Sequence, residues 1–207
     1  MPSGTNTIHF IRHTNIPADR RATYLRIIAE LRPLKAETKR VRFTVGGNQI
    51  DFPPGKVSTP TADLTTVKLL LNSVLSTPQA KFVTADIANY YLNNPMARFE
   101  YMRIPIHDIP PSIMSQYNLL PLVHNGNIMV EIRKGMYRLP QAGIIANTRL
   151  VKHLATHGYH PVANTASLFT HAYQPITFCL TVDDFGIKYV DTANINHLFQ
   201  ALRELYT

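Results

Sequence analysis

The sequence predicts an α+β fold built on a ferredoxin-like sheet that carries helices on one face. From Lys81 onwards the expected elements run strand, helix, hairpin, helix, strand pair and helix. Two β–α units that share one sheet produce such a layer. The clearest strands lie in the segment FCLTVDDFGIKY at residues 178–189, where β-branched and aromatic runs surround an acidic pair. This pattern places Asp183 and Asp184 at the tip of a β-hairpin.

The composition is that of an ordinary globular protein. The chain has 207 residues, enough for one domain or for one domain with a small lobe, and 45% of them are hydrophobic. No apolar run approaches the roughly 18 residues of a membrane span, and the N-terminus lacks the apolar region of a signal peptide. The single cysteine, Cys179, falls in the expected core hairpin. We interpret it as a small hydrophobic residue of an intracellular protein that has no membrane partner.

The net charge of +8 is compatible with a partner that carries phosphate, because a one-sided basic surface attracts nucleic acid. The alternative is a basic protein that never binds nucleic acid, since such a charge is common there too. Much of the basic excess falls within the first 56 residues, at Arg20, Arg21, Arg26, Arg32, Lys35, Lys39, Arg40, Arg42 and Lys56. Zinc is not expected, since one cysteine and nine histidines show no recognised ligand spacing. His157 and His160 flank an expected helix end, where ordinary surface roles are the interpretation.

The N-terminal half gives one ambiguous segment and one clear one. Residues 1–22 are expected to be irregular. Residues 23–31 fit the periodicity of both a helix and a strand, whereas residues 40–45 alternate cleanly and end at Gly46. A hairpin of these two segments is favoured because an isolated strand needs a partner. A loop rich in glycine and proline is expected at residues 46–60.

Four helices, one hairpin turn and one further strand are predicted along the rest of the chain. A helix should run from Thr61 to the proline at position 78, and a polar helix should occupy residues 111–119. Asn125-Gly126 predicts a hairpin turn between residues 122–123 and 128–130. A helix over residues 140–157 should end at Gly158, a strand should cover residues 166–171, and a last helix should start near Asp191. The last helix is expected to bury Ile195, Leu198, Phe199, Leu202 and Leu205.

Three carboxylates stand out as candidate metal ligands. Asp86 follows the strand expected at residues 81–85, and only a shared sheet would bring it next to Asp183 and Asp184. Clustered carboxylate oxygens suit Mg²⁺ better than Zn²⁺. The alternatives are an ordinary solvated turn for the acidic pair and a helix N-cap for Asp86.

Five segments resemble a known family of polymerases. FVTADIANYYLNNPM (residues 82–96), KGMYRLPQAGIIAN (residues 134–147) and FCLTVDDFGIKY resemble motifs A, B and C of a reverse transcriptase, most closely of the type found in copia-like LTR retrotransposons. RVRFTVGG (residues 40–47) and STPTADLTTVKLLLNSVLS (residues 58–76) resemble the finger segments that precede motif A. The resemblance covers residues 39–206. It implies a polymerase palm at residues 81–207, an N-terminal segment and part of the fingers at residues 1–80, and a fingers hairpin inserted near residues 120–135.

The resemblance implies RNA- or DNA-templated DNA synthesis by two-metal nucleotidyl transfer to a primer 3′-hydroxyl. Asp86, Asp183, Asp184 and the backbone carbonyl of Ile87 would hold two Mg²⁺ ions, for which Mn²⁺ would substitute. The partners would be a template with its primer, dNTPs and the rest of a Pol polyprotein. A cytoplasmic particle is the implied location.

The resemblance also assigns residues to the incoming dNTP. Tyr91 would screen the sugar, Gln141 would contact the nucleotide, and Gly143 would allow its close approach. Arg42, with Arg40 or Lys39, would clamp the triphosphate. Each has an alternative role: Tyr90 or Tyr91 as a core aromatic, Gln141 as a solvated helix-start amide, and the arginines as a solvated edge strand.

Two residues depart from the family pattern. Thr181 stands where an aromatic residue is usual, and Arg138 stands where a glycine is usual. An arginine there would either crowd a turn that requires a positive φ or reach a template phosphate. Because the sequence stops after the helix that follows motif C, with no thumb or RNase H segment, a fragment of a polyprotein or a decayed copy is expected. The alternative function is therefore an inactive remnant that only binds nucleic acid. An RNA-binding module is less favoured, since it would carry aromatic residues at its strand centres.

Overall fold

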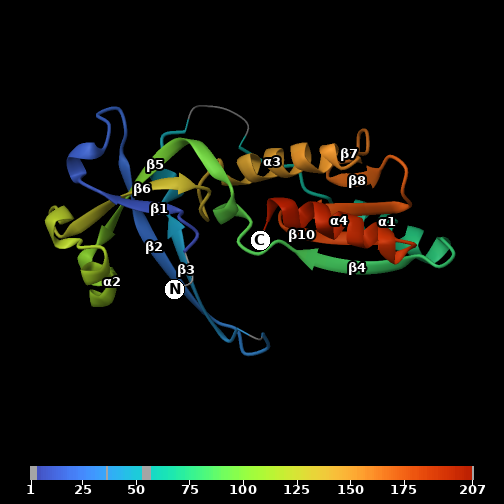
Figure 1. Cartoon of the computed structure of the whole chain (residues 1–207), viewed down its shortest axis with the longest axis horizontal. Helices are drawn as coiled ribbons and strands as arrows, with labels where there is room; N and C mark the ends of the chain where they lie inside the picture. Colours follow the sequence, from blue (N-terminus) through green and yellow to red (C-terminus); the bar gives the residue numbers. More distant parts are fainter. Residues whose placement is uncertain (1–3, 36, 53–56, 207) are drawn as a thin grey trace. The chain divides into compact units, whose positions relative to one another are not determined.

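The chain divides into two compact units. The computed structural model describes residues 4–35, 37–52 and 57–206. Unit 1 comprises Met1–Val57 and Tyr91–Gly143, and unit 2 comprises Ser58–Tyr90 and Ile144–Thr207 (Figure 1). Each unit contains one five-stranded sheet, so the predicted α+β class is confirmed. None of the helices in the described part of the chain is long and apolar enough to cross a membrane.

The sheet of unit 1 has the strand order β1-β6-β5-β2-β3. Its strands are β1 (Ile8–Ile11), β2 (Ala22–Leu31), β3 (Lys39–Val45), β5 (Pro95–Pro105) and β6 (Asn127–Lys134). The neighbours pair antiparallel except β2 and β5, which run parallel over three residue pairs. The prediction of an irregular segment over residues 1–22 is wrong for β1, which pairs with β6, and β5 was not predicted. Unit 1 also contains the helix α2 (Pro111–Gln116), which starts where the polar helix over residues 111–119 was predicted to start.

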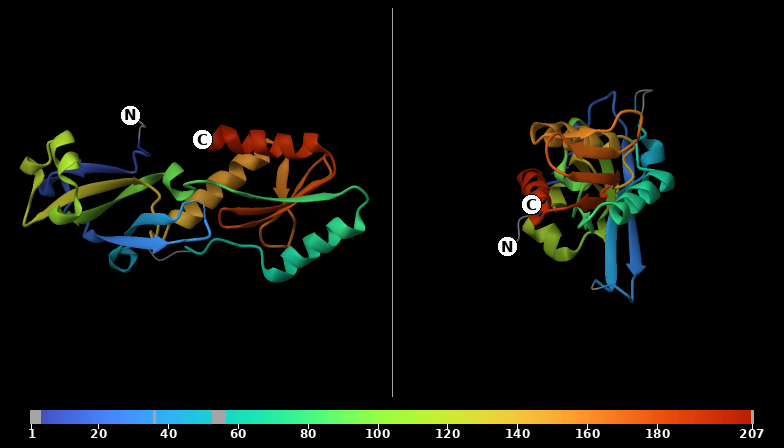
Figure 2. Two further views of the ribbon diagram at one scale, coloured as in Figure 1. Left: turned by 90° about the horizontal axis from the view of Figure 1, so that it is seen from below. Right: turned by 90° about the vertical axis from the view of Figure 1, so that its right-hand side faces the viewer.

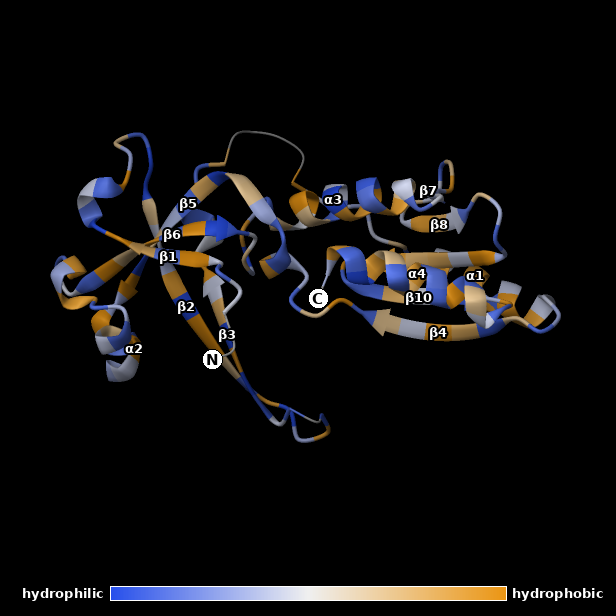
Figure 3. Cartoon of the chain, viewed as in Figure 1, coloured by the Kyte–Doolittle hydropathy of each residue, from blue (hydrophilic) through white to orange (hydrophobic). Residues whose placement is uncertain are grey.

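The β2–β3 hairpin confirms the prediction that residues 23–31 and 40–45 form a hairpin of two strands. Leu31 pairs with Lys39 at its closed end and Leu25 pairs with Val45 at the other. Only one of the three alternating apolar residues of β3 faces a core. Val41 and Phe43 are 62% and 51% exposed, whereas Val45 is buried, and Arg40 and Arg42 on the other face are half-buried. Figure 3 shows hydrophobic residues along β2 in this hairpin. Residues 53–56 of the expected loop at 46–60 lie outside the described residues.

The turn at Asn125-Gly126 forms as predicted, but the hairpin around it differs. Both residues have positive φ, 48° and 71°, which is the pattern of a type I′ turn. The strand after the turn is β6, which pairs with β1 and with β5, where Pro105 lies opposite Asn127. The residues before the turn, Leu120–Leu122, form a 3-10 helix with a proline near its start. The predicted first arm at residues 122–123 therefore forms no strand, and an isolated bridge between His124 and Asn127 closes the turn. A fingers hairpin near residues 120–135 stays a prediction.

The sheet of unit 2 has the strand order β4-β10-β9-β8-β7, with all neighbours antiparallel. Its strands are β4 (Lys81–Asp86), β7 (Tyr159–Pro161), β8 (Leu168–His171), β9 (Ile176–Thr181) and β10 (Asp184–Tyr189). Its helices are α1 (Leu64–Ser76), α4 (Thr192–Leu205) and most of α3 (Ala142–Thr156). The predicted helix ends are confirmed: Asp191 caps α4 and Gly158, with φ 83°, follows α3.

Helices cover both faces of this sheet, and the prediction of helices on one face is therefore wrong. Phe178 and Cys179 are adjacent on β9 and point to opposite faces. Cys179 packs in a buried cluster with Leu70 of α1. Phe178 packs against Tyr159, whose hydroxyl is hydrogen-bonded to His197 of α4 at 2.9 Å. Figure 2 shows α1 on one side of the strands and α4 on the other.

This packing explains why the two units divide the chain differently from the expected boundary at residue 80. The helix α1, expected among the fingers segments, buries Leu70 against β9 and so belongs to unit 2. Unit 1 residues Tyr91–Gly143 are inserted between β4 and the rest of unit 2. Cys179 is free and buried, as interpreted from the sequence, and its burial raises the pKa of the thiol.

Candidate active site

The sheet of unit 2 places two of the predicted carboxylates directly opposite each other. Asp86 is the last residue of β4, Asp184 is the first residue of β10, and the two are paired in the antiparallel register. The backbone N–H of Ile87 donates to the carbonyl of Asp183 at 3.2 Å. That bond makes Asp86 and Asp184 a non-hydrogen-bonded pair, the kind in which side chains on the same face approach most closely, with Cα atoms about 4.5 Å apart.

Asp183 lies beside this pair in the turn of the β9–β10 hairpin. Thr181 pairs with Asp184, which leaves Val182 and Asp183 as a two-residue loop. Val182 has a φ of 62° and Asp183 does not have a positive φ, which is the pattern of a type II′ turn. That turn favours glycine at its first position, so a β-branched valine there stores about 1–3 kcal/mol of strain. The turn is therefore Val182-Asp183, one residue earlier than the acidic pair that was predicted for it, because Asp184 already belongs to β10. The strands around this turn hold it in an unusual conformation.

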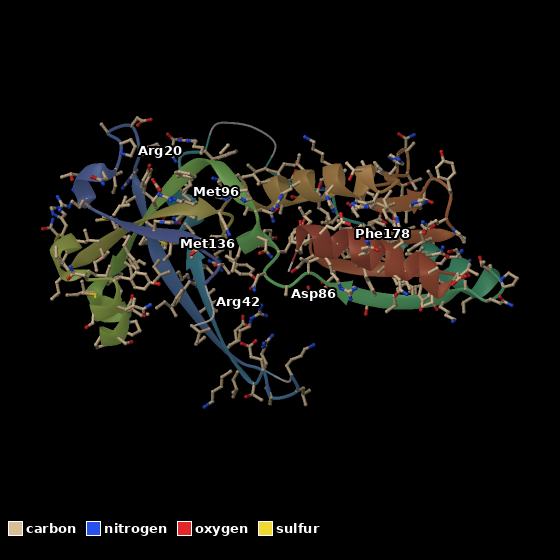
Figure 4. All side chains as sticks on the ribbon, in the orientation of Figure 1. Arg20, Arg42, Asp86, Met96, Met136 and Phe178 are labelled. Atoms are coloured by element: carbon tan, nitrogen blue, oxygen red, sulfur yellow. The ribbon has the colours of Figure 1, made fainter. Side chains whose placement is uncertain are left out.

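The environment of Asp86 and Asp184 leaves these two carboxylates open to a cation. Asp86 and Asp184 are exposed, and Asp183 is half-buried. Among the described residues no salt bridge reaches Asp86 or Asp184. Lys188 lies four residues from Asp184 on the same face of β10, but its ammonium donates to the hydroxyl of Thr77 at 2.8 Å. Two like charges opposite each other destabilise a strand pair, and a bound divalent cation would offset that cost. Figure 4 marks Asp86 at the end of β4.

The two adjacent tyrosines have different surroundings. Tyr90 is 2% exposed and packs against Tyr206 in unit 2, with ring centroids 5.8 Å apart. It is therefore the core aromatic that the sequence predicted for one of the pair. Tyr91 belongs to unit 1, is half-buried, and meets the ring of Tyr137 edge-on at 5.4 Å. Its contact with a nucleotide sugar stays a prediction.

Gln141 belongs to a buried polar network, and the alternative of a solvated amide is wrong. Gln141 is 3% exposed, and its Nε2 donates to the carboxylate of Glu100 at 3.0 Å. The other oxygen of Glu100 accepts from Arg20 at 2.6 Å. The Oε1 of Gln141 is buried and has no hydrogen-bond partner among the described residues. Sequence reasoning missed Arg20 and Glu100, because their partners lie far away along the chain.

Arg40 and Arg42 share one face of β3, as their alternation predicted. Arg42 approaches Glu30 at 3.9 Å and lies over the ring of Tyr137, with 5.6 Å between its Cζ and the ring centroid. Arg40 approaches Glu37 at 3.8 Å. Lys39 is exposed at the start of the strand, and Gly143 is the half-buried second residue of α3. Arg42 is labelled in Figure 4.

Arg138 occupies a backbone conformation that glycine favours. Its φ is 70°, so this turn has the positive φ that was inferred from the glycine usual at this position. The neighbouring loop fits closely against it, because a Cβ on Gly47 would lie 2.2 Å from the carbonyl oxygen of Arg138. Arg138 and Arg26 both line a hollow next to Gly46 and Gly47 in unit 1.

Unit 2 also contains a histidine-rich cluster that sequence reasoning missed. His153, His157 and Glu204 each offer one ligand atom, and these atoms lie within 4.8 Å of one another. The available signal was the spacing of the two histidines, four residues apart at the end of a helix. The sequence interpretation had paired His157 with His160 instead, and His160 is exposed on β7.

The histidine at the end of β8 predicts a pH dependence of stability. Burial, and then the nearby His197, lower the pKa of His171 from its ordinary value of 6.5, and its Nδ1 accepts from two backbone N–H groups at 3.0 Å. The unfolded chain therefore binds the proton first, so stability should fall as the pH drops below 6.5 and level off below the folded pKa. His171→Asn should flatten this slope in unfolding titrations at several pH values. His107→Asn, in an exposed position of unit 1, should keep the wild-type slope.

No protein-family model matches the chain, and a search of curated proteins finds no match.

Proposed function

We propose that this chain is the fingers and palm part of a retrotransposon reverse transcriptase, which adds dNTPs to a primer 3′-hydroxyl on an RNA or DNA template. One observation supports the proposal most: the sheet of unit 2 puts Asp86 directly opposite Asp184, with Asp183 next to it in the turn. These are the positions that resemble motifs A and C. Their exposure and the mutual repulsion of the paired carboxylates suit a divalent cation.

The carboxylates supply what nucleotidyl transfer requires of a protein. When bound, two Mg²⁺ ions roughly 3.5–4 Å apart would polarise the primer 3′-hydroxyl and neutralise the triphosphate and the departing pyrophosphate. Asp86 and Asp184 present their carboxylates on the same face from two different strands, and Asp183 adds a third from the turn. The Ile87 N–H holds the turn in register through the Asp183 carbonyl, at 3.2 Å.

The nucleotide contacts of the proposal belong to unit 1 and come from the resemblance. They are Tyr91, Gln141, Gly143, Arg42, Arg40 and Lys39. Two features support them: Arg42 has its guanidinium held over the ring of Tyr137, and Gln141 keeps one buried oxygen without a partner among the described residues. The proposal includes a template with its primer and the rest of a Pol polyprotein as partners, with a cytoplasmic particle as the location.

A second candidate function is an inactive remnant that binds nucleic acid without polymerising. Arg138 favours it, because the family usually has glycine at this position and the arginine adopts φ 70° there. The net charge of +8 would serve binding in either case. The two candidates differ in whether metal-dependent incorporation occurs.

Primer extension on a poly(rA)/oligo(dT) template with Mg²⁺ or Mn²⁺ tests the proposal. Wild-type protein should incorporate dTTP, a chelator should stop it, and Asp183→Asn should abolish it because a carboxylate ligand is lost. Asp19→Asn, which removes an exposed acid from unit 1, is the matched control and should incorporate like wild type. Folded wild-type protein that binds the template but incorporates nothing would exclude the enzyme and establish the remnant.

A further inference from the structure

The ends of two helices in unit 2 bring together nitrogen and oxygen ligands of a different kind from the aspartates. His153 lies in the last turn of α3, and His157 follows it by four residues, so both rings lie on the same side. Glu204 lies in the last turn of α4. The ligand atoms of the three side chains are all within 4.8 Å of one another. None of these residues belongs to the proposed function.

Polar contacts already orient all three side chains. The Nε2 of His157 donates to the Oε2 of Glu204 at 3.0 Å. The Nε2 of His153 lies 2.7 Å from the carbonyl oxygen of Ala201 and must donate to it. In the neutral ring this leaves Nδ1 of His153 with the lone pair. Histidines that bind metals commonly donate their other ring N–H to a backbone carbonyl, which fixes the tautomer in the same way.

We propose that His153, His157 and Glu204 form a binding site for one divalent transition-metal ion of the Zn²⁺ class. Two imidazole nitrogens and one carboxylate oxygen are a common ligand set for zinc, with water completing a tetrahedron. Mg²⁺ prefers oxygen ligands and is a poor match. Two histidines four residues apart at the end of a helix are a recognised chelating arrangement.

The distances are close to those that such an ion requires. Zinc–nitrogen and zinc–oxygen bonds of about 2.0–2.2 Å in a tetrahedron put two ligand atoms about 3.3 Å apart. His157 and Glu204 are already at 3.0 Å, with a proton where the ion would sit. The ligand atom of His153 lies within 4.8 Å of the other two and would have to move closer to complete the site. The side chains of His157 and Glu204 are 23% and 47% exposed, so an ion can enter from solvent and keep a water ligand.

A bound ion would connect the end of α3 to the end of α4. At present the two helices are joined there by the His153–Ala201 hydrogen bond and the His157–Glu204 pair. A surface pair of that kind contributes little by itself, because solvent screens it. The ion would replace one proton with a divalent charge and add His153 as a third ligand, which makes the site a fixed connection between the helices.

Titration of Zn²⁺ into chelator-treated protein, followed by calorimetry, tests this site, and the visible spectrum with Co²⁺ reports its geometry. Excess Mg²⁺ is kept in the buffer so that the aspartates do not take up zinc. Wild-type protein should bind one ion, and the Co²⁺ spectrum should be that of a tetrahedral site. His157→Gln and Glu204→Gln should each weaken binding at least about tenfold, since even outer-shell partners of metal ligands have effects of that size.

His160→Gln is the matched control, since it removes an exposed histidine of the same unit that lies outside the cluster. It should bind zinc like wild type. Both test variants change exposed or half-exposed side chains and keep an amide for hydrogen bonding, and circular dichroism would verify their fold. The proposal is overturned if wild type binds no zinc, or if the two variants bind it as tightly as the control does. Asp183→Asn should leave zinc binding intact, so failure of the polymerase proposal would not affect this one.

Discussion

Asparagine at position 86 or 184 should abolish templated incorporation and at the same time make unit 2 more stable. Asp86 and Asp184 are paired across β4 and β10 without a salt bridge among the described residues. Removing one of two opposed charges relieves repulsion worth up to about 1 kcal/mol. Removing a metal ligand should lower incorporation about a thousandfold or more, because the charge stabilisation it supports is worth several kcal/mol. Loss of activity with a gain in stability is typical of a functional site.

Primer extension and thermal unfolding, each with and without Mg²⁺, measure both halves of this prediction. Mg²⁺ should raise the melting temperature of wild type, since it binds the folded state, and should have less effect on Asp184→Asn. Asp19→Asn should leave both measurements unchanged. If Asp184→Asn is less stable than wild type, the carboxylate has a structural role and the metal hypothesis loses its main support. A gain in stability without wild-type activity would instead identify the inactive remnant.

Local patterns were sufficient to predict the strands that carry these aspartates. The runs on either side of Asp183-Asp184 are apolar and β-branched, and an acidic pair between them marks a turn whatever the rest of the chain does. The pairing of Asp86 with Asp184 came from the order of elements and from the resemblance. The type II′ turn could not be predicted, because valine at position 182 opposes it and the surrounding strands impose it.

Most of the elements that the sequence did not predict depend on contacts between segments that are distant along the chain. The strand β1 has only four residues and exists because β6 supplies its ladder. The strand β5 runs parallel to β2, and nothing in either sequence marks such a pairing. Helices on both faces of the unit 2 sheet follow from Cys179 and Phe178 both being buried, but an apolar run on one strand does not show which helices cover it.

The same limit applies to the candidate site. Arg40 and Arg42 were placed on one face correctly because alternation is a local property of a strand. Gln141 was expected to be solvated if it did not bind a nucleotide, since helix starts are usually exposed. Its burial depends on Glu100, 41 residues away in the chain, and on Arg20, 80 residues from that glutamate. No periodicity connects such positions.

The network of Arg20, Glu100 and Gln141 should give the largest loss of stability. The side chains of Arg20 and Glu100 are 10% and 4% exposed, and Arg20 also donates to the carbonyl of Phe99 at 2.6 Å. Arg20→Met would leave the Glu100 carboxylate buried with only the amide of Gln141 as a partner. Breaking a buried pair in this way costs about 3–5 kcal/mol. Arg32→Met, at the more exposed Arg32–Glu37 pair, should cost no more than about 1 kcal/mol.

Amide hydrogen exchange of β5 and β6 is the suitable measurement, since the chain contains no tryptophan and its two units need not unfold together. Protection of these strands should fall in Arg20→Met and stay near the wild-type level in Arg32→Met. The double variant Arg20→Met with Glu100→Met should recover most of the loss, because replacing both charges by apolar groups leaves none uncompensated. A double variant no more stable than Arg20→Met alone would show that the packing of Arg20, rather than its charge, holds the network. In that case the orientation of Gln141 would depend on shape, and the electrostatic account of this end of unit 1 would be wrong.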